Sequence, residues 1–135
     1  MEIGDLCADE IEAAVALWVT SGLTRPWNDA TADARLALAS PSSTILAGRE
    51  AGTLIATIMA GFDGHRAWVY YLAVAPDQQG RKFGREMMAA AEAWLRERDA
   101  PRLNLMVRAD NIVARRFYEA LGYKASDVTV FQRDL

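Results

Sequence analysis

The pattern of apolar and polar positions along the chain predicts helices and strands in a mixed order. Runs with apolar residues at helical spacing predict helices, and short runs rich in β-branched and aromatic residues predict strands. The expected helices span 9–21, 31–39, 83–95 and 111–121. The expected strands span 1–6, 44–49, 53–62, 65–74, 103–107 and 128–131. This order, β-α-α-β-β-β-α-β-α-β, predicts an α/β (α+β) fold with one mixed central sheet flanked by helices.

One strand-turn-helix connection carries the clearest sign of function. An apolar strand ends near Val74, a polar turn containing Gly80 follows, and an amphipathic helix opens around Phe83 or Gly84. The first N–H groups of a helix lack internal partners and carry partial positive charge, so they can hold a phosphate or pyrophosphate. The apolar face expected for this helix comprises Met87, Met88, Ala91, Trp94 and Leu95.

Charged residues beside that helix start strengthen the interpretation. Arg81, Lys82 and Arg85 add full positive charges. The spacing matches neither the three-glycine dinucleotide fingerprint nor the P-loop. Taken alone, the stretch also fits an ordinary strand-to-helix connection with a solvated turn.

Composition narrows the class of protein. The chain has 135 residues, 52% of them hydrophobic, which is enough for a single domain spanning 1–135 with its own core. The net charge of −3, from 15 basic and 18 acidic residues, gives no basic field to attract nucleic acid. One cysteine, Cys7, and one histidine, His65, exclude an internal disulfide and a zinc cage. We therefore expect no metal, and we expect Cys7 to be a buried small apolar residue.

The sequence shows no sign of a membrane or export segment. No apolar run reaches the ~18 residues needed to span a bilayer. The acidic start lacks the basic region of a secretory leader. We therefore expect a cytoplasmic protein with no membrane partner.

A second informative stretch runs from Asp110 to Tyr123. Asn111 and Tyr118 are seven residues apart, about two helical turns, so they share a face of the expected helix. For this helix alone, the simpler interpretation is that Asn111 caps the helix and Tyr118 is a core aromatic residue.

Together, the two stretches resemble the GCN5-related N-acetyltransferase (GNAT) superfamily. The family's acyl-CoA loop has the pattern (Gln/Arg)-x-x-Gly-x-(Gly/Ala), and the chain offers residues 79–84, Gln-Gly-Arg-Lys-Phe-Gly. The family's second motif, Asn-x-x-Ala-x-x-x-Tyr-x-x-x-Gly-(Phe/Tyr), is matched from Asn111 to Tyr123. Residues 23–29 and 61–66 further resemble the YpeA-type bacterial acetyltransferases. One position departs from the pattern, because Lys82 replaces the family's middle glycine. If the backbone there has a positive φ, the lysine costs about 1–2 kcal/mol.

The resemblance implies direct transfer of an acetyl group from acetyl-CoA to an amine in a ternary complex. Tyr118 is the implied general acid, and Asn111 is implied to bind the pantetheine arm. The strand end is implied to pair with the pantetheine amides, and the loop to hold the pyrophosphate. The residues implied to bind acetyl-CoA are Leu72, Ala73, Val74, Gln79, Gly80, Arg81, Lys82, Phe83, Gly84, Arg85 and Asn111.

The sequence indicates the residues that bind the acceptor amine less clearly than those that bind acetyl-CoA. Arg25, Trp27 and Asn28 lie in a loop that lines the acceptor side in this family, although Trp27 could equally be a core residue. Arg25 could pair with a carboxylate, which favours an amino acid, a small metabolite or a peptide or protein N-terminus over a polyamine. Tyr70 and Tyr71 alternate on a strand, so one should face the cleft and the other the helices. The candidate general bases are Asp63, His65 and Glu50. Asp63 and His65 flank an expected hairpin, so both could equally be turn residues.

Two other functions compete with the enzyme. A catalytically silent acyl-CoA-binding regulatory module is suggested by Lys82 and by the lack of an obvious base. A nucleotide-binding domain could use the same helix start, although its usual motifs are absent. The resemblance leaves a homodimer open and implies neither metal nor nucleic acid as a partner.

Overall fold

The computed structural model describes all residues from 1 to 135, and they form two compact units, Met1–Leu105 and Met106–Leu135. The first unit contains the sheet and three α-helices. Its elements, in chain order, are β1 (Glu2–Asp5), η1 (Ala8–Glu10), α1 (Ile11–Thr20), α2 (Ala30–Ala39), β2 (Ser43–Glu50), β3 (Thr53–Phe62), β4 (Ala67–Val74), η2 (Pro76–Gln78), α3 (Phe83–Arg96) and β5 (Leu103–Asn104). The second unit contains α4 (Ile112–Ala120).

The sheet is five-stranded, in the order β1-β2-β3-β4-β5. The first four strands are antiparallel neighbours, and β5 joins β4 in parallel after the chain has crossed through α3. A parallel pair requires such a crossover, because a short turn can only reverse the chain. The mixed sheet expected from the element order is therefore confirmed.

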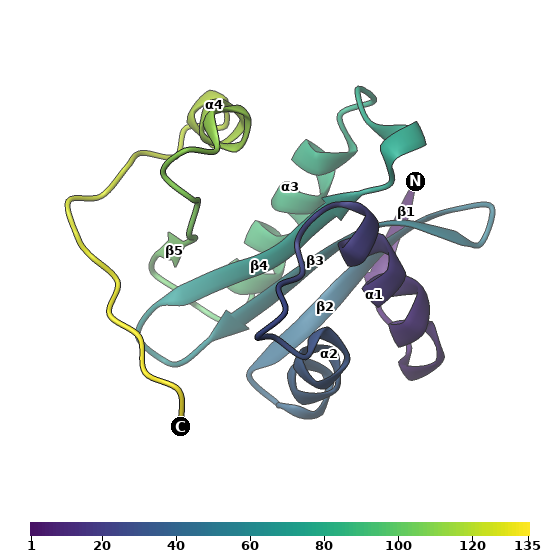
Figure 1. Cartoon of the computed structure of the whole chain (residues 1–135), viewed down its shortest axis with the longest axis horizontal. Helices are drawn as coiled ribbons and strands as arrows, with labels where there is room; N and C mark the ends of the chain where they lie inside the picture. Colours follow the sequence, from purple (N-terminus) through teal and green to yellow (C-terminus); the bar gives the residue numbers. More distant parts are fainter. The chain divides into compact units, whose positions relative to one another are not determined.

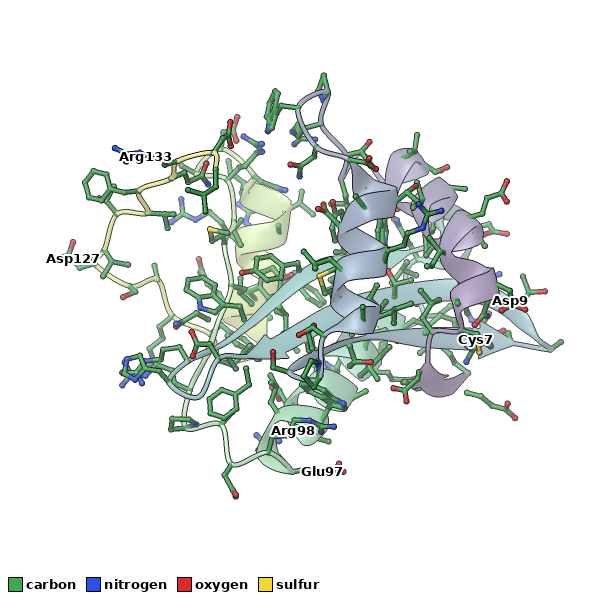
Figure 2. The ribbon with its side chains drawn as sticks, turned by 90° about the horizontal axis from the view of Figure 1, so that it is seen from below. Cys7, Asp9, Glu97, Arg98, Asp127 and Arg133 are labelled. Carbon is green, nitrogen blue, oxygen red and sulfur yellow. The ribbon has the colours of Figure 1, made fainter.

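Helices cover both faces of the sheet in the first unit. Helices α1 and α2 lie over one face and α3 lies over the other (Figures 1 and 2). The α1–α2 side has a core built around Trp18 and Ile45. On the α3 side Met87, Met88, Ala91 and Leu95 are buried as expected, whereas Trp94, expected on the same face, is only partly buried. Successive strand residues point to opposite faces, so β2 and β3 contribute to both layers.

Two helices leave apolar residues exposed. In α1 the apolar spacing predicts one face made of Ile11, Val15, Trp18 and Val19. Trp18 is buried as expected, together with Ala14 and Leu17, but Val19 is 58% exposed. In α2 the apolar Leu36 is 74% exposed. Helix α2 instead buries three alanines, Ala30, Ala34 and Ala37. Their small side chains let the helix lie close to its neighbours.

The chain beyond the sheet also differs from expectation. The strand expected over 103–107 is limited to Leu103–Asn104, and the strand expected over 128–131 is absent. Residues 128–131 pair with no other strand, and Phe131 is 93% exposed. A strand needs a hydrogen-bonded neighbour, so alternation alone does not produce one. No helix is long and apolar enough to cross a membrane.

Candidate functional site

Strand β4 has an edge without a partner strand over most of its length. β5 pairs with it only at Ala67 and Trp68, so within the first unit residues 69–74 have no ladder partner on that side. The Ala75 N–H donates to the Ile55 carbonyl at 2.7 Å, which directs the polar groups of Ala75 toward β3. Along a strand the backbone N–H and carbonyl groups of successive residues point to opposite edges. The N–H and carbonyl of Val74 therefore point to the open edge.

A bulge in β4 lies next to this edge. In the ladder Thr57 faces Ala73 and Met59 faces Tyr70, so β4 holds one more residue than β3 between these pairs. Tyr71 lies in this interval and has a φ of 51°. Its ring stacks on Trp18 with centroids 3.9 Å apart. As expected, the two neighbouring tyrosines differ: Tyr71 packs against α1, whereas Tyr70 is 41% exposed.

The loop after β4 prepares the start of α3. Gly80 has a φ of 83° and Lys82 a φ of 66°. Glycine adopts such a conformation readily, whereas the left-handed Lys82 costs about 1–2 kcal/mol. Lys82 is the residue before the first turn of α3, and its side chain accepts no capping hydrogen bond. The N–H groups of Gly84 and Arg85 donate to no backbone carbonyl. The helix therefore begins with free donors.

The positive charges around this loop are not equivalent. Arg81 forms an ion pair with Glu50 of β2 at 3.1 Å, and it also donates to Gln78 Oε1 at 2.6 Å. Its guanidinium lies 4.7 Å from the centre of the Phe83 ring. Lys82 and Arg85 are exposed, and neither takes part in any of the ion pairs of the chain. These two cations are available to an anion at the helix start.

Gln79 contacts the end of β4. Its Nε2 donates to the Val74 carbonyl at 3.2 Å, which satisfies one of the polar groups on the open edge. The Val74 N–H stays available. This hydrogen bond joins the strand end, Leu72–Val74, to residues 79–85 of the first unit across the short helix η2.

Asn111 and Tyr118 belong to the second unit. The Asn111 side chain accepts from the Ala114 N–H at 3.1 Å, so it caps α4. Tyr118 packs edge-on against Phe117 and Tyr123. Burial raises the pKa of the Tyr118 hydroxyl above its ordinary value, so this group is protonated at neutral pH.

Comparison with known proteins identifies the family. Residues 12–123 match the family model described as Acetyltransferase (GNAT) family. A Yersinia pestis protein described as an acetyltransferase is 37% identical over 135 residues, covering 100% of this chain and 96% of the relative. This chain belongs to the GNAT acetyltransferase family. It is therefore an N-acetyltransferase.

Solved structures share the fold of this acetyltransferase. AAC(6')-Iy in complex with the bisubstrate analogue CoA-S-monomethyl-acetylneamine has a TM-score of 0.82 at 16% identity, covering 99% of this chain and 97% of that one. A protein described as a predicted acetyltransferase, from Clostridium acetobutylicum and with acetyl-CoA, has a TM-score of 0.81 at 15% identity, covering 98% and 95%. At such identities the likeness concerns the fold alone.

The expected acceptor-side residues of the acetyltransferase lie in two loops of the first unit. In the loop after α1, Arg25 Nη1 donates to the carbonyls of Gly22 and Thr24 at 2.9 and 2.8 Å. Trp27 is 74% exposed, so its alternative role as a core residue is wrong. The Asn28 N–H donates to the Arg25 carbonyl at 3.0 Å, which closes a turn around Pro26.

The second loop contains the candidate bases Asp63 and His65. Asp63 Oδ1 accepts from the N–H groups of His65 and Arg66 at 2.7 and 2.8 Å. These backbone hydrogen bonds, Arg66 first, lower the pKa of Asp63, which makes it a weaker base. Burial, and secondarily Asp63, raise the pKa of Tyr70. The third candidate, Glu50, is held by Arg81.

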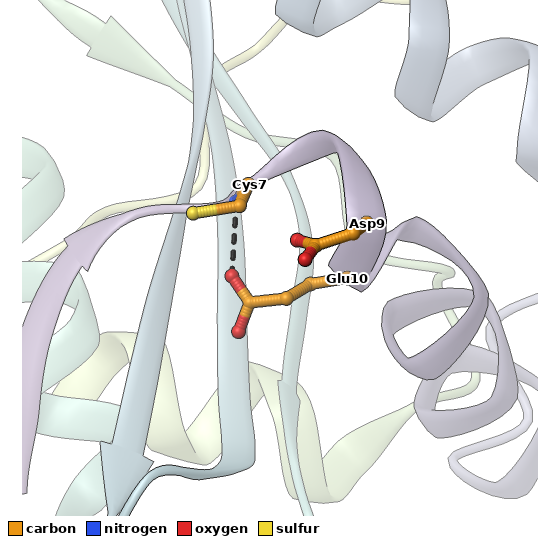
Figure 3. A group of neighbouring side chains, drawn as sticks. All are labelled: Cys7, Asp9 and Glu10. Carbon is orange, nitrogen blue, oxygen red and sulfur yellow. Dashed lines mark hydrogen bonds between the residues drawn. The ribbon is translucent and has the colours of Figure 1, made fainter.

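The cysteine near the amino terminus is not where we expected it. Cys7 is exposed rather than buried. It lies beside Asp9 and Glu10, and its N–H donates to Glu10 Oε1 at 2.9 Å (Figure 3). Arg49 Nε donates to Glu10 Oε2 at 2.9 Å. The hydrogen bond from Arg49 and then that from Cys7 lower the pKa of Glu10 to about 2. The group therefore ties the start of α1 to β2.

Several residues near the site were not identified from the sequence. Thr57 is fully buried and hydrogen-bonded to the bulge, and Asp33 accepts from the Tyr71 hydroxyl at 2.7 Å. Burial and then the Asp33 hydrogen bond raise the pKa of Tyr71 to about 12. The two adjacent tyrosines, Tyr70 and Tyr71, do not by themselves distinguish a bulge from a regular strand.

Proposed function

We propose that this acetyltransferase moves an acetyl group from acetyl-CoA to a primary amine by direct transfer in a ternary complex. The observation that carries the proposal is the continuity of the site. An unpaired strand edge at Leu72–Val74 is followed, after the short helix η2, by a left-handed loop and a helix start with free N–H groups. An extended amide-containing arm ending in a pyrophosphate matches both parts in order.

The pyrophosphate is assigned to the start of α3. Backbone N–H groups of residues 81–85 would bind its oxygens, and Lys82 and Arg85 would add charge. Hydrogen bonds to a charged group contribute about 1.5–3 kcal/mol each, so a few of them dominate the affinity. Arg81 would contribute only after giving up part of its ion pair with Glu50.

The pantetheine arm is assigned to the β4 edge and to Asn111. The Val74 N–H points to the open edge and would pair with a pantetheine carbonyl. The Asn111 Oδ1 already accepts from Ala114. Its amide Nδ2 therefore remains as the donor available to the arm.

The chemistry assigned to Tyr118 is proton donation. The amine nitrogen attacks the thioester carbonyl carbon, a C–N bond forms, and the C–S bond breaks with its electron pair passing to sulfur. The Tyr118 hydroxyl supplies the proton that this thiolate takes up, and the amine loses a proton through water to a base. A raised pKa keeps the Tyr118 hydroxyl protonated for this role.

We propose that the acceptor carries a carboxylate near its amine. The Arg25 side chain is fixed by two carbonyls through Nη1, and this leaves its other guanidinium N–H groups to bind a carboxylate. The exposed Trp27 ring, two residues away, offers an apolar surface. An amino acid, a small amine-carboxylate metabolite or a peptide N-terminus fits this loop better than a polyamine, which Arg25 would repel.

A screen of amines tests the proposed function. Release of CoA thiol would be followed with acetyl-CoA and amino acids, peptides, polyamines or aminoglycosides as acceptors. We expect turnover with carboxylate-bearing amines, and we expect Arg25→Ala to raise their KM about ten-fold while leaving the KM for acetyl-CoA nearly unchanged. Arg35→Ala, an exposed arginine on α2, is the matched control. Best turnover with a polyamine, or an unchanged acceptor KM in Arg25→Ala, would refute the acceptor assignment.

A further inference from the structure

A buried threonine holds the β4 bulge of this acetyltransferase. Thr57 has no exposed surface. Its Oγ1 accepts from Trp18 Nε1 at 2.8 Å and donates to the Tyr71 carbonyl at 2.9 Å. One hydroxyl thus links α1, β3 and β4 at a single point.

The Tyr71 carbonyl needs this partner because of the bulge. At the bulge the regular ladder between β3 and β4 is interrupted, since β4 carries the additional residue. Tyr71 is also left-handed, with a φ of 51°, a conformation that a bulky non-glycine residue rarely adopts. The Tyr71 carbonyl is partly buried, and a carbonyl withdrawn from water without a donor is destabilising, by up to about 1–3 kcal/mol when it is fully buried. The Thr57 hydroxyl removes this cost, so it favours the bulged path of the strand over a regular one.

The Tyr71 side chain is held at two further points. Its ring stacks on Trp18 at an interplanar angle of 14°, and its hydroxyl donates to Asp33 of α2 at 2.7 Å. Trp18 in turn donates to Thr57. Thr57, Trp18 and Asp33 therefore form one connected set that fixes the backbone and the side chain of the same residue.

We propose that Thr57 is a positioning residue for acyl-CoA binding: through the Tyr71 carbonyl it fixes the path of residues 72–74, whose edge amides receive the pantetheine arm. This inference rests on the proposed function. A strand that loses the bulge shifts by one residue, and such a slip turns every following polar group to the opposite edge. The Val74 N–H would then face β3 instead of the ligand.

The chain supplies a control that separates positioning from stability. Thr44 is the other buried polar side chain of the protein, 8% exposed, and it lies on β2, where it donates to Asp5 Oδ1 at 3.3 Å. Thr44→Val and Thr57→Val remove the same hydroxyl from the same sheet. Only the second removes a hydrogen bond from the bulge.

The experiment measures acetyl-CoA affinity by calorimetry, with folding followed by circular dichroism and thermal unfolding. We expect Thr57→Val to weaken affinity about ten-fold, Thr57→Ser to stay within about two-fold of the wild type, and Thr44→Val to leave affinity unchanged. The KM for acetyl-CoA should follow the affinity, while kcat at saturation should change less. A folded Thr57→Val protein with wild-type affinity, or an equal loss in Thr44→Val, would overturn the inference.

Two further results complete the test. If Thr57→Val does not fold, Thr57→Ala replaces it, since this variant removes the same hydroxyl without placing a methyl group where the hydroxyl was. It should weaken acetyl-CoA affinity about ten-fold, and wild-type affinity would then overturn the inference. Failure of the wild-type protein to bind acetyl-CoA would instead refute the proposed function itself.

Discussion

Helices α3 and α4 begin in opposite ways. At α4 the Asn111 side chain accepts from the Ala114 N–H at 3.1 Å. Helix α2 begins likewise, with Asp29 Oδ1 accepting from Ala32 N–H at 3.0 Å. At α3 the corresponding residue is Lys82, which has a left-handed backbone and a side chain that cannot accept a hydrogen bond.

The starts of α2 and α4 are capped within the protein, whereas the start of α3 leaves its N–H groups open to a ligand. A side-chain cap satisfies the first N–H groups and stabilises the helix by about 1 kcal/mol. The start of α3 forgoes that stabilisation, and the left-handed Lys82 adds a further cost. A ligand anion can take the place of the missing cap. We therefore expect α3 to act through its backbone and α4 through its side chains, and the following predictions test that division.

The largest effect on activity is expected from loss of the Tyr118 hydroxyl on α4. Tyr118→Phe should lower kcat by roughly 10²–10⁴-fold, the usual range for loss of a general acid, with little change in acetyl-CoA affinity. Steady-state kinetics with the best acceptor from the amine screen would measure it. Tyr123→Phe is the control, because the family motif accepts either aromatic residue there. Wild-type turnover in the Tyr118 variant would make this residue a packing aromatic only.

A smaller but still large effect is expected at the start of α3. Gly84→Val places a branched side chain where the backbone should approach the pyrophosphate, and it should weaken CoA affinity by about 100-fold. Calorimetry on the folded variant would measure it. Ala89→Val, exposed on the same helix, introduces the same branched side chain away from the site and should bind CoA normally. Unchanged affinity in Gly84→Val would refute the pyrophosphate assignment.

The cap of α4 permits a more selective test. Asn111→Asp keeps an acceptor for Ala114 N–H but loses the amide donor. It should therefore raise the KM for acetyl-CoA about ten-fold while changing the free energy of unfolding by less than about 0.5 kcal/mol. Asp29→Ala removes the cap of α2. It should lower the free energy of unfolding by about 1 kcal/mol and leave the KM for acetyl-CoA unchanged. An unchanged KM in Asn111→Asp would limit Asn111 to capping.

The smallest effect concerns the loop itself. Lys82→Gly should relieve the left-handed conformation and stabilise the protein by about 0.5–1 kcal/mol in urea unfolding, while weakening acetyl-CoA affinity no more than about three-fold. Asp99→Gly is a matched control, because Asp99 also has a positive φ, 61°, and lies beyond the other end of α3. It should be stabilising without any change in affinity. A Lys82→Gly protein no more stable than the wild type would show that the lysine is not strained.

The sequence predicted those features that depend on short-range patterns. The span of β3, the start of α3 at Phe83 and the Asn111 cap agree with expectation. Periodicity and capping chemistry are local, so one sequence is enough to identify them. The two motifs also led to the family to which the chain belongs.

What the sequence did not predict depends on distant partners. The bulge at Tyr71 requires Thr57 and Trp18, which are 14 and 53 residues away in the chain, and the usual sign of a positive φ, a glycine, is absent. The expected strand over 128–131 fails because strand formation depends on a neighbour. Cys7 is exposed because the turn between β1 and α1 is held by Glu10 and Arg49, not by burial of the cysteine.

The bulge at Tyr71 also bears on how molecules of this protein behave toward one another. An unpaired strand edge invites pairing with another chain and is a common origin of aggregation. On β4 the left-handed Tyr71 interrupts this edge, so only Leu72–Val74 remain regular beyond it, and so short an edge disfavours pairing with another chain. The residue that shapes the edge for a small ligand thereby makes the same edge a poor surface for self-association.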